Sequence, residues 1–264
     1  MTTHLLLGGG TGLVGGLLTE RLLARPDMAL TSLVRQRPPL PGGEGRQGEA
    51  LTGEGRKPEQ ASPSDPPRAR ATRESSSPCP GGEVFCDFEA LVADPAAEVA
   101  RLNLPPCEVG ISCLGTTIAK AKSQAAFRRV DHDYVLALAK AAKALGARRF
   151  ILVSSVGAKA GSGNFYLSVK GGIEAAVAAL GFDRLDILRP GLILGPRADR
   201  RPAEEWAQRA AAWLNPVVKA IAPDYAAVRA EDVAAKICDL TQPSAIPDIF
   251  GIPGTGHLPF VADQ

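Results

Sequence analysis

Tyr166 and Lys170 stand four residues apart in the stretch Tyr-Leu-Ser-Val-Lys, a spacing that could do chemistry. On a helix, residues at i and i+4 lie one turn apart on the same face. A phenol and an ammonium placed in this way could transfer a proton to or from a substrate oxygen. An ordinary helix surface can carry the same pair by chance, because Tyr-x-x-x-Lys alone is a weak motif. The rest of the chain has to decide between these two interpretations.

A glycine-rich turn near the N-terminus predicts a phosphate-binding loop. An apolar run over residues 4–7 leads straight into glycines, and a helical apolar stripe follows them up to Pro26. In this strand, turn and helix context, glycines allow a tight turn, close approach to a pyrophosphate, and close packing of helix on strand. The helix N-terminus also offers free N–H groups to phosphates. A glycine-rich turn without a ligand is the alternative. The dinucleotide-binding residues predicted here are Gly9, Thr11, Gly12, Leu13, Val14 and Gly15.

The end of the second expected strand, residues 29–34, predicts which dinucleotide binds. Arg35 follows this strand, about 20 residues after Gly15, and no acid occupies the neighbourhood. An acid in this place would bind the ribose 2′-hydroxyl of NAD, whereas a cation suits the 2′-phosphate of NADP. We therefore expect NADP(H) in preference to NAD(H), with Arg35 as a contact. The alternative is an arginine that is solvated at a strand end.

Two further expected strands end in residues that could reach the same ligand. Residues 83–88 read as a strand with Asp87 at its end, and residues 108–114 read as a strand that runs into a Gly-Thr-Thr loop. Ligands of an open parallel sheet bind beyond the carboxyl ends of its strands. The cofactor-binding residues predicted from these ends are Asp87, Leu114, Gly115 and Thr116.

The second half of the chain supplies the elements that would position Tyr166 and Lys170. Apolar residues at steps of three and four predict a helix over 123–145, and an apolar run predicts a strand over 149–155 that ends in two serines. A helix from about 165 to 180 carries both residues, and a strand over 185–188 follows it. This alternation predicts an α/β fold, a three-layer Rossmann-like doubly wound parallel sheet.

The composition, with 45% hydrophobic and 22% charged residues, fits one globular domain or at most two small ones, and we expect a single domain over residues 1–264. A net charge of +2 gives no reason to expect a nucleic-acid partner, and no apolar run approaches the length of about 18 residues that spans a membrane. The five cysteines have no paired spacing, which indicates reduced thiols and a cytoplasmic protein. The three histidines lie far apart, so we expect no metal site.

Residues 38–82 do not fit this pattern. The segment is rich in proline and glycine, and Leu40 and Leu51 are its only large aliphatic residues. It cannot bury enough apolar surface to offset the entropy lost on ordering its backbone. We therefore expect a disordered surface insertion.

Several motifs in order resemble the atypical short-chain dehydrogenases/reductases: GGTGLVG (9–15), LVSS (152–155), YLSVK (166–170) and RPG (189–191). More narrowly, SCLGTT, DHDYV, NFYLSVKG and LRPGLILGPR are similar to the subgroup that contains the Tat-interacting-protein oxidoreductases and their small bacterial and fungal relatives. The similarity covers residues 4 to 37 and 84 to about 205, and the insertion at 38–82 departs from it.

This resemblance implies roles for individual residues. Tyr166 would be the general acid that protonates a carbonyl oxygen as hydride arrives, and Ser155 would hold that oxygen. Lys170 would favour the phenolate form of Tyr166 and hydrogen-bond the nicotinamide ribose. Pro190 and Gly191 would line the nicotinamide pocket with backbone.

The resemblance also implies a small C-terminal region, 196–264, that covers a small-molecule substrate. The expected function is an NADPH-dependent oxidoreductase that reduces a small carbonyl compound. An NADP(H)-binding regulatory or interaction protein without turnover is the alternative. A nucleotide-sugar epimerase or dehydratase ranks last, because it needs a larger substrate domain than the roughly 70 residues here.

Overall fold

The computed structural model describes residues 2–35, 82–195, 226–242 and 256–257. The chain divides into two units, residues 1–36 with 80–264 and residues 37–79, and the second unit lies outside the described residues. The expected disordered insertion over 38–82 therefore also lies outside them, apart from Gly82, which begins a strand.

The first unit is built on a largely parallel sheet. Its strands are β1 (Thr3–Gly8), β2 (Met28–Arg35), β3 (Gly82–Cys86), β4 (Val109–Ser112), β5 (Arg149–Val153), β6 (Arg184–Leu188) and β9 (Gly256–His257). The spatial order is β3-β2-β1-β4-β5-β6-β9, and only β9 pairs antiparallel, against β6. The chain winds outward from β1 in both directions, so the order reverses between β1 and β4. The predicted doubly wound α/β fold is confirmed.

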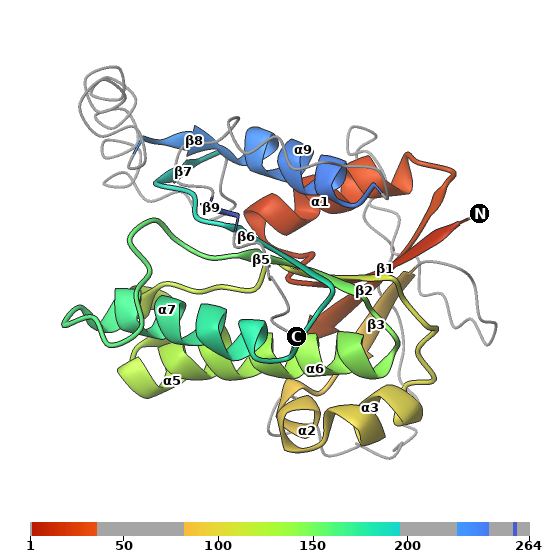
Figure 1. Ribbon diagram of the computed structural model, residues 1–264, viewed down its shortest axis with the longest axis horizontal. Coiled ribbons are helices and arrows are strands. Elements are labelled where there is room, and N and C mark those ends of the chain that lie inside the picture. Colours follow the sequence, from red (N-terminus) through yellow and green to blue (C-terminus); the bar gives the residue numbers. More distant parts are fainter. Residues whose placement is uncertain (1, 36–81, 196–225, 243–255, 258–264) are drawn as a thin grey trace, which may run out of the picture. The chain divides into compact units, whose positions relative to one another are not determined.

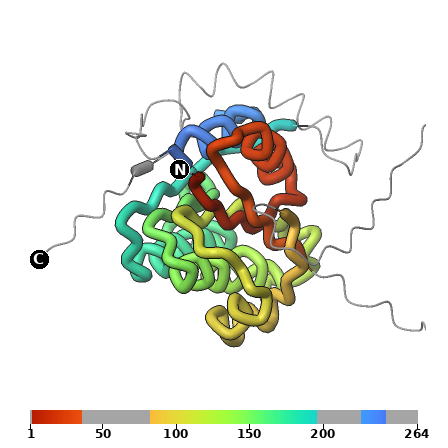
Figure 2. Tube along the Cα trace, turned by 90° about the vertical axis from the view of Figure 1, so that its right-hand side faces the viewer, coloured from red at the N-terminus to blue at the C-terminus, as the bar shows by residue number. Residues whose placement is uncertain are grey.

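Helices cover both faces of this sheet. Those that the structure describes are α1 (Leu13–Leu23), α2 (Phe88–Ala93), α3 (Pro95–Arg101), α4 (Ile118–Ala121), α5 (Gln124–Arg128), α6 (Val135–Ala144), α7 (Phe165–Ala178) and α9 (Ala230–Leu240). Figure 1 shows α1 and α9 on one face and α5, α6 and α7 on the other. Figure 2 shows α1 and α9, in red and blue, packed side by side. The two helix layers enclose the sheet, as a parallel sheet requires.

The C-terminal region contributes to these layers where it is described. Besides α9 and β9, the short strand β8 (Val228–Arg229) pairs in parallel with β7 (Ile193–Leu194). The remainder of 196–264 lies outside the described residues. The division into a single domain with a C-terminal lid stays a prediction.

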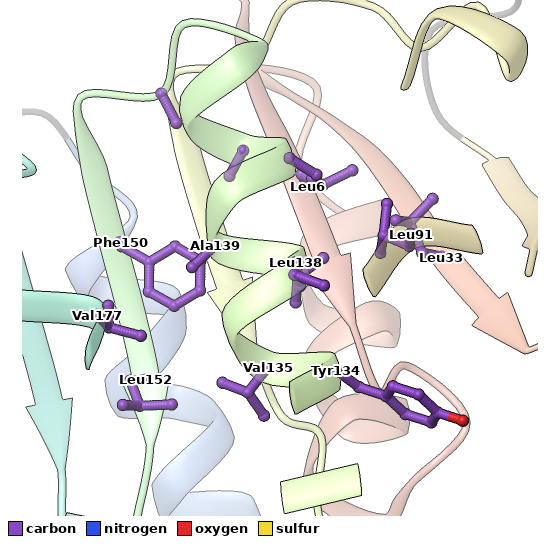
Figure 3. Close-up of a cluster of buried hydrophobic side chains, with 14 of the residues drawn as sticks. Leu6, Leu33, Leu91, Tyr134, Val135, Leu138, Ala139, Phe150, Leu152 and Val177 are labelled. Carbon is purple, nitrogen blue, oxygen red and sulfur yellow. The ribbon is translucent and has the colours of Figure 1, made fainter. Parts of the chain in front are cut away.

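Each face of the sheet has its own hydrophobic core. On the α6 and α7 face, Leu6, Leu33 and Phe150 of the sheet belong to one buried cluster with Leu138 and Val177 of the helices, all labelled in Figure 3. On the other face, the neighbours of Leu6 along β1 pack against α1 and α9. Successive residues of β1 therefore serve opposite cores, which explains why the strand is a continuous apolar run rather than an alternating one.

A π-helical turn interrupts the helix predicted over 123–145. The turn, η1 (Arg129–Tyr134), lies between α5 and α6. The predicted apolar stripe is kept, since Phe127, Tyr134 and Leu138 are buried. The π turn also brings the charged residue Asp131 into the interior. Such turns are rare and occur frequently at functional sites. Spacing alone predicts an ordinary α-helix here, because the stripe on either side of η1 keeps helical steps.

The third strand is shorter than predicted, because β3 ends at Cys86 and Asp87 caps a helix. The Asp87 carboxylate accepts hydrogen bonds from the backbone N–H groups of Glu89 and Ala90 at 2.9 and 3.5 Å. Asp94, followed by a proline, caps α3 in the same way. These N-cap signals were present in the sequence, but the two short helices were not predicted.

We expect Gly15→Ala to destabilise the protein by about 1–3 kcal/mol, the usual cost of overpacking. A Cβ at Gly15 would lie 2.1 Å from the backbone oxygen of Gly9, which cannot move without deforming the turn. Gly16→Ala is the matched control, because a Cβ there would lie 3.6 Å from the oxygen of Gly10, an ordinary contact. Urea unfolding measures both variants. Equal stability of the two variants would contradict the close approach.

Candidate functional site

The glycine-rich turn connects β1 to α1 at the carboxyl edge of the sheet. Gly9 has a φ of +89°, in the left-handed region, and a Cβ there would lie 2.6 Å from the backbone of Cys113. Gly12 is the N-cap of α1, and no side chain caps that helix. The N–H groups of the first turn are therefore available to an anion such as a pyrophosphate.

The other residues predicted for this turn have different surroundings. Thr11 is exposed, Leu13 is half-buried, and Val14 is buried in the core beneath α1. A Cβ at Gly9 would also lie 2.7 Å from the backbone nitrogen of Leu114, so the turn touches the loop that follows β4. The structure thus brings the predicted phosphate turn and the predicted loop 114–116 together.

Arg35 and Asp87 lie at the carboxyl ends of the neighbouring strands β2 and β3. Arg35 is exposed and is the register partner of Cys86, which directly precedes Asp87. The Oδ1 atom of Asp87 is occupied by its capping of α2. Both residues are therefore at the edge where the cofactor is expected, and Asp87 also has a local structural role.

A charged cluster that the sequence did not predict borders this end of the sheet. The guanidinium of Arg129 hydrogen-bonds both carboxylate oxygens of Glu89, and the Tyr134 hydroxyl donates to Glu89 Oε1 at 2.5 Å. These bonds lower the pKa of Glu89, and the bond from Arg129 has the larger effect. Burial has the largest effect on the pKa of Tyr134 and raises it, and the hydrogen bond to Glu89 raises it further. The positive charge of Arg35 acts in the opposite direction and lowers it. Arg35 is thus within electrostatic range of a cluster in which acid and base are already paired.

Helix α7 carries the predicted acid and its lysine. Asn164 caps the helix, accepting from the Leu167 N–H at 3.2 Å. Tyr166 is half-buried, and its ring lies 5.6 Å from that of Phe127 between centroids. Lys170, one turn further on, is buried. Tyr166 and Lys170 thus lie one turn apart on the same helix, as their spacing predicts.

Ser155 follows β5 in a loop that packs directly on α7. The Lys159 N–H donates to the Leu167 oxygen at 3.1 Å. A Cβ at Gly171 would lie 2.1 Å from the backbone nitrogen of Ala160, so this close approach requires glycine. Ser155 is half-buried, and the loop that it begins contacts the helix that carries the predicted acid at Lys159 and Ala160.

Lys170 forms a buried ion pair with Asp131 of η1. The distance from Lys170 Nζ to Asp131 Oδ1 is 2.8 Å, and Asp131 Oδ2 accepts the Thr116 N–H at 2.8 Å. A Cβ at Gly115 would be 3.5 Å from Asp131 Oδ1 and 3.9 Å from Lys170 Nζ. The predicted catalytic lysine and the predicted loop 114–116 therefore meet at one carboxylate. Helical spacing did not reveal Asp131, because the π turn is what brings it inward.

The segment after β6 is tied to α7 by a second ion pair. Arg189 donates to Glu174 through Nε at 3.0 Å and Nη2 at 2.5 Å, and this bonding raises the pKa of Arg189. The next residue, Pro190, accepts the Val156 N–H through its carbonyl at 3.1 Å. Pro190, with Gly191 after it, is thereby joined to the loop that begins at Ser155.

The predicted site residues consequently form two groups along one sheet edge. Tyr166 and Lys170 lie on α7, the loop that begins at Ser155 packs on this helix, and Pro190 bonds that loop. Arg35 and Asp87 lie at the ends of β2 and β3. The glycine-rich turn and the loop after β4 touch each other where the strand order reverses. This arrangement can accommodate an extended ligand that runs across the switch point. The roles of the individual residues stay predictions.

The part of the chain that the structure describes contains neither a candidate metal cluster nor a candidate membrane span. There, no group of three or more His, Cys, Asp or Glu side chains is placed to hold a metal ion. In the same part, every helix is too short or too polar to cross a bilayer.

Comparison with known sequences identifies relatives, although no protein-family model matches the chain. The chain is 39% identical to the mitochondrial protein fmp52 of Emericella nidulans over 158 residues. This match covers 60% of the present chain and 67% of the fungal protein. The chain is 33% identical over 213 residues to the mitochondrial protein FMP52 of Coccidioides immitis, a match that covers 78% of this chain and 74% of the fungal protein. It is 51% identical over 102 residues to Protein HTATIP2 of Rattus norvegicus, covering 39% and 41%. This last match spans less than half of the rat protein.

Comparison with solved structures supports the fold. The Bordetella bronchiseptica enzyme WbmH, in complex with NAD+, superposes with a TM-score of 0.55 at 14% identity, covering 91% of this chain and 72% of that one. The UDP-N-acetylglucosamine 4-epimerase of Bacillus cereus gives a TM-score of 0.55 at 11% identity, covering 91% and 74%. At such low identity, these likenesses show the fold and nothing of the substrate.

The expected cytoplasmic location is wrong. The fungal relatives, at 33% and 39% identity, are named as mitochondrial proteins. The expectation rested on unpaired cysteine spacing, which reports the redox state of a compartment and cannot identify the compartment.

We expect Gly171→Ala to destabilise the protein by about 1–3 kcal/mol, because its new methyl group would strike the backbone of the loop after Ser155. Gly172→Ala is the matched control, since a Cβ there would lie 3.7 Å from the ring of His132. Urea unfolding and hydrogen exchange at the Lys159 amide measure the two effects. A Gly171→Ala variant as stable as the control, with the Lys159 amide still protected, would show that the loop does not depend on glycine.

Proposed function

The chain belongs to the atypical short-chain dehydrogenases/reductases of the HTATIP2- and FMP52-like group, and on this premise we propose that it is an NADPH-dependent oxidoreductase acting on a small carbonyl compound. Its fold is the NAD(P)-binding Rossmann fold of that superfamily.

One observation carries the proposal. Helix α7 holds Tyr166 and Lys170 beside the loop that begins at Ser155, and Lys170 reaches the loop after β4 through Asp131. That loop in turn touches the glycine-rich turn at Gly9. The residues proposed for proton transfer are thus linked by contacts to those proposed for phosphate binding, which supports a dinucleotide-dependent reduction.

Each residue has a distinct part in the proposed reaction. A bound nicotinamide cofactor would supply the hydride. Tyr166 would donate its hydroxyl proton to the carbonyl oxygen as that oxygen becomes negative, and Ser155 would hold the oxygen by a hydrogen bond. The Lys170 ammonium would stabilise the resulting phenolate. The backbone of Pro190 and Gly191 would border the nicotinamide.

Cofactor preference follows from charge at the end of β2. Arg35 is exposed there, while the cations and acids of the neighbouring Glu89 and Arg129 cluster are paired with one another. An exposed guanidinium can bind a phosphate through two N–H groups, as the 2′-phosphate of NADP offers. We therefore assign the preference for NADP(H) to Arg35.

We expect Arg35→Ala to weaken NADPH binding by on the order of 1–3 kcal/mol and to leave NADH binding unchanged, because only NADPH carries the 2′-phosphate. Calorimetric titration of both cofactors into both proteins measures the difference. Arg25→Ala is the control, because Arg25 precedes β2 at its opposite end and pairs with Asp27. Wild-type protein that binds NADPH and NADH equally would rule out this role of Arg35.

We expect Tyr166→Phe to lower kcat/KM by about 10²- to 10⁴-fold, the usual contribution of a general acid, with NADPH affinity little changed. Tyr134→Phe removes the same hydroxyl from a residue that bonds Glu89 and should have a small effect on turnover. A panel of aldehydes and ketones, followed by NADPH absorbance, provides the assay. If Tyr166→Phe and wild type turn over equally, Tyr166 is not the acid. NADPH binding without turnover of any compound would instead support a regulatory protein.

A further inference from the structure

Asp131 is the most deeply buried acid near the proposed catalytic helix. Its exposed fraction is 1%, and that of its partner Lys170 is 6%. One carboxylate oxygen lies 2.8 Å from Lys170 Nζ, and the other accepts the backbone N–H of Thr116 at 2.8 Å. A single side chain therefore connects three separate parts of the fold, namely η1, α7 and the loop after β4.

The π-helical turn is what presents this carboxylate to both partners. Residues of η1 pack along α7, where the ring of His132 lies over Gly172. Asp133, two residues further on, points instead to Arg129 at 3.3 Å and to His132 at 2.9 Å. Only one of the two acids of the turn thus faces Lys170, and the other makes a half-buried contact with its own helix.

The energetics of burial explain why Lys170 needs this partner. A buried ammonium without an opposite charge is strongly unfavourable, so the carboxylate of Asp131 stabilises the charged form of Lys170 inside the fold. An ammonium has three N–H donors, and pairing with one carboxylate oxygen leaves donors for other partners. The acid can therefore fix where the nitrogen lies without using up its capacity to bind a phenol or a ribose.

We propose that Asp131 is a positioning residue, which holds the Lys170 ammonium and the Thr116 backbone at a fixed separation before the cofactor arrives. The inference rests on the proposed function, because it takes Lys170 as the partner of the Tyr166 phenolate and of the nicotinamide ribose, and Thr116 as one of the residues predicted to bind the dinucleotide. A site whose groups are already in place binds its ligand with less loss of conformational freedom. Asp131 itself touches neither substrate nor cofactor in this role.

The first test is a double-mutant cycle on NADPH affinity with Asp131→Asn and Lys170→Met. Asparagine keeps the size of the side chain and an acceptor for the Thr116 N–H, but it removes the charge that faces Lys170. We expect Asp131→Asn to weaken NADPH binding about tenfold in the wild-type background and to have little effect once Lys170 is methionine. An equal loss in both backgrounds, or no loss in either, would overturn the proposal.

Asp133→Asn is the matched control, because it makes the same chemical change in the same turn at a carboxylate that does not face Lys170. It should leave NADPH affinity within about twofold of wild type, as expected for a residue that is not coupled to the site. A loss as large as that of Asp131→Asn would mean that any charge removed from η1 has this effect, and would overturn the proposal.

A second test needs no cofactor and separates this proposal from the proposed function. The Thr116 amide donates to a charged carboxylate, which makes a stronger hydrogen bond than a neutral amide does. In Asp131→Asn, we expect the Thr116 amide proton to move upfield in the NMR spectrum and to exchange faster, with no change in Asp133→Asn. If wild type binds neither NADPH nor NADH, the proposed function fails, and the Thr116 amide measurement alone decides whether Asp131 positions the loop after β4. An unaltered Thr116 amide in Asp131→Asn would overturn the proposal.

Discussion

The requirement that a parallel sheet be buried on both faces shapes most of this structure. Leu5 and Leu7 face the core under α1 and α9, while Leu6 between them faces the core under α6. Helices must therefore cover both sides, and each crossover returns the chain to the same end of the sheet. As a result, the loops that follow β1, β4, β5 and β6 leave the sheet at one edge, where β2 also ends at Arg35. The site exists because the core forces these loops together.

Within that edge, charge pairs provide the order that the loops lack by themselves. Lys170 pairs with Asp131, and Glu174, one turn along α7, pairs with Arg189. Buried pairs of this kind add little net stability, because the cost of removing both charges from water offsets their attraction. Their effect is geometric, since one pair ties α7 to η1 and, through Asp131, to the loop after β4, while the other ties α7 to the segment after β6. Close backbone contacts at Gly9 and Gly171 serve the same purpose where no side chain can fit.

The cellular location expected from the cysteine pattern illustrates how far composition can mislead. Unpaired cysteines indicate a reducing compartment, yet the fungal relatives are named as mitochondrial proteins. Burial keeps the thiols of Cys86, Cys107 and Cys113 protonated by raising each pKa to about 12, so their chemistry is set by the fold. A cysteine pattern is thus a poor guide to a cellular address when the residues are simply small members of the core.

The sequence by itself determined the alternation of the main strands and helices, the position of the glycine-rich turn, and the placement of Tyr166 and Lys170 on one helix. These features depend on local periodicity and on glycines next to strand ends, which are visible in a single chain. Only the tertiary structure showed that a π turn brings Asp131 to Lys170, that Asp87 caps a helix, and that Glu174 pairs with Arg189. Such pairings join residues from different elements, and their formation depends on packing distances that no local pattern records.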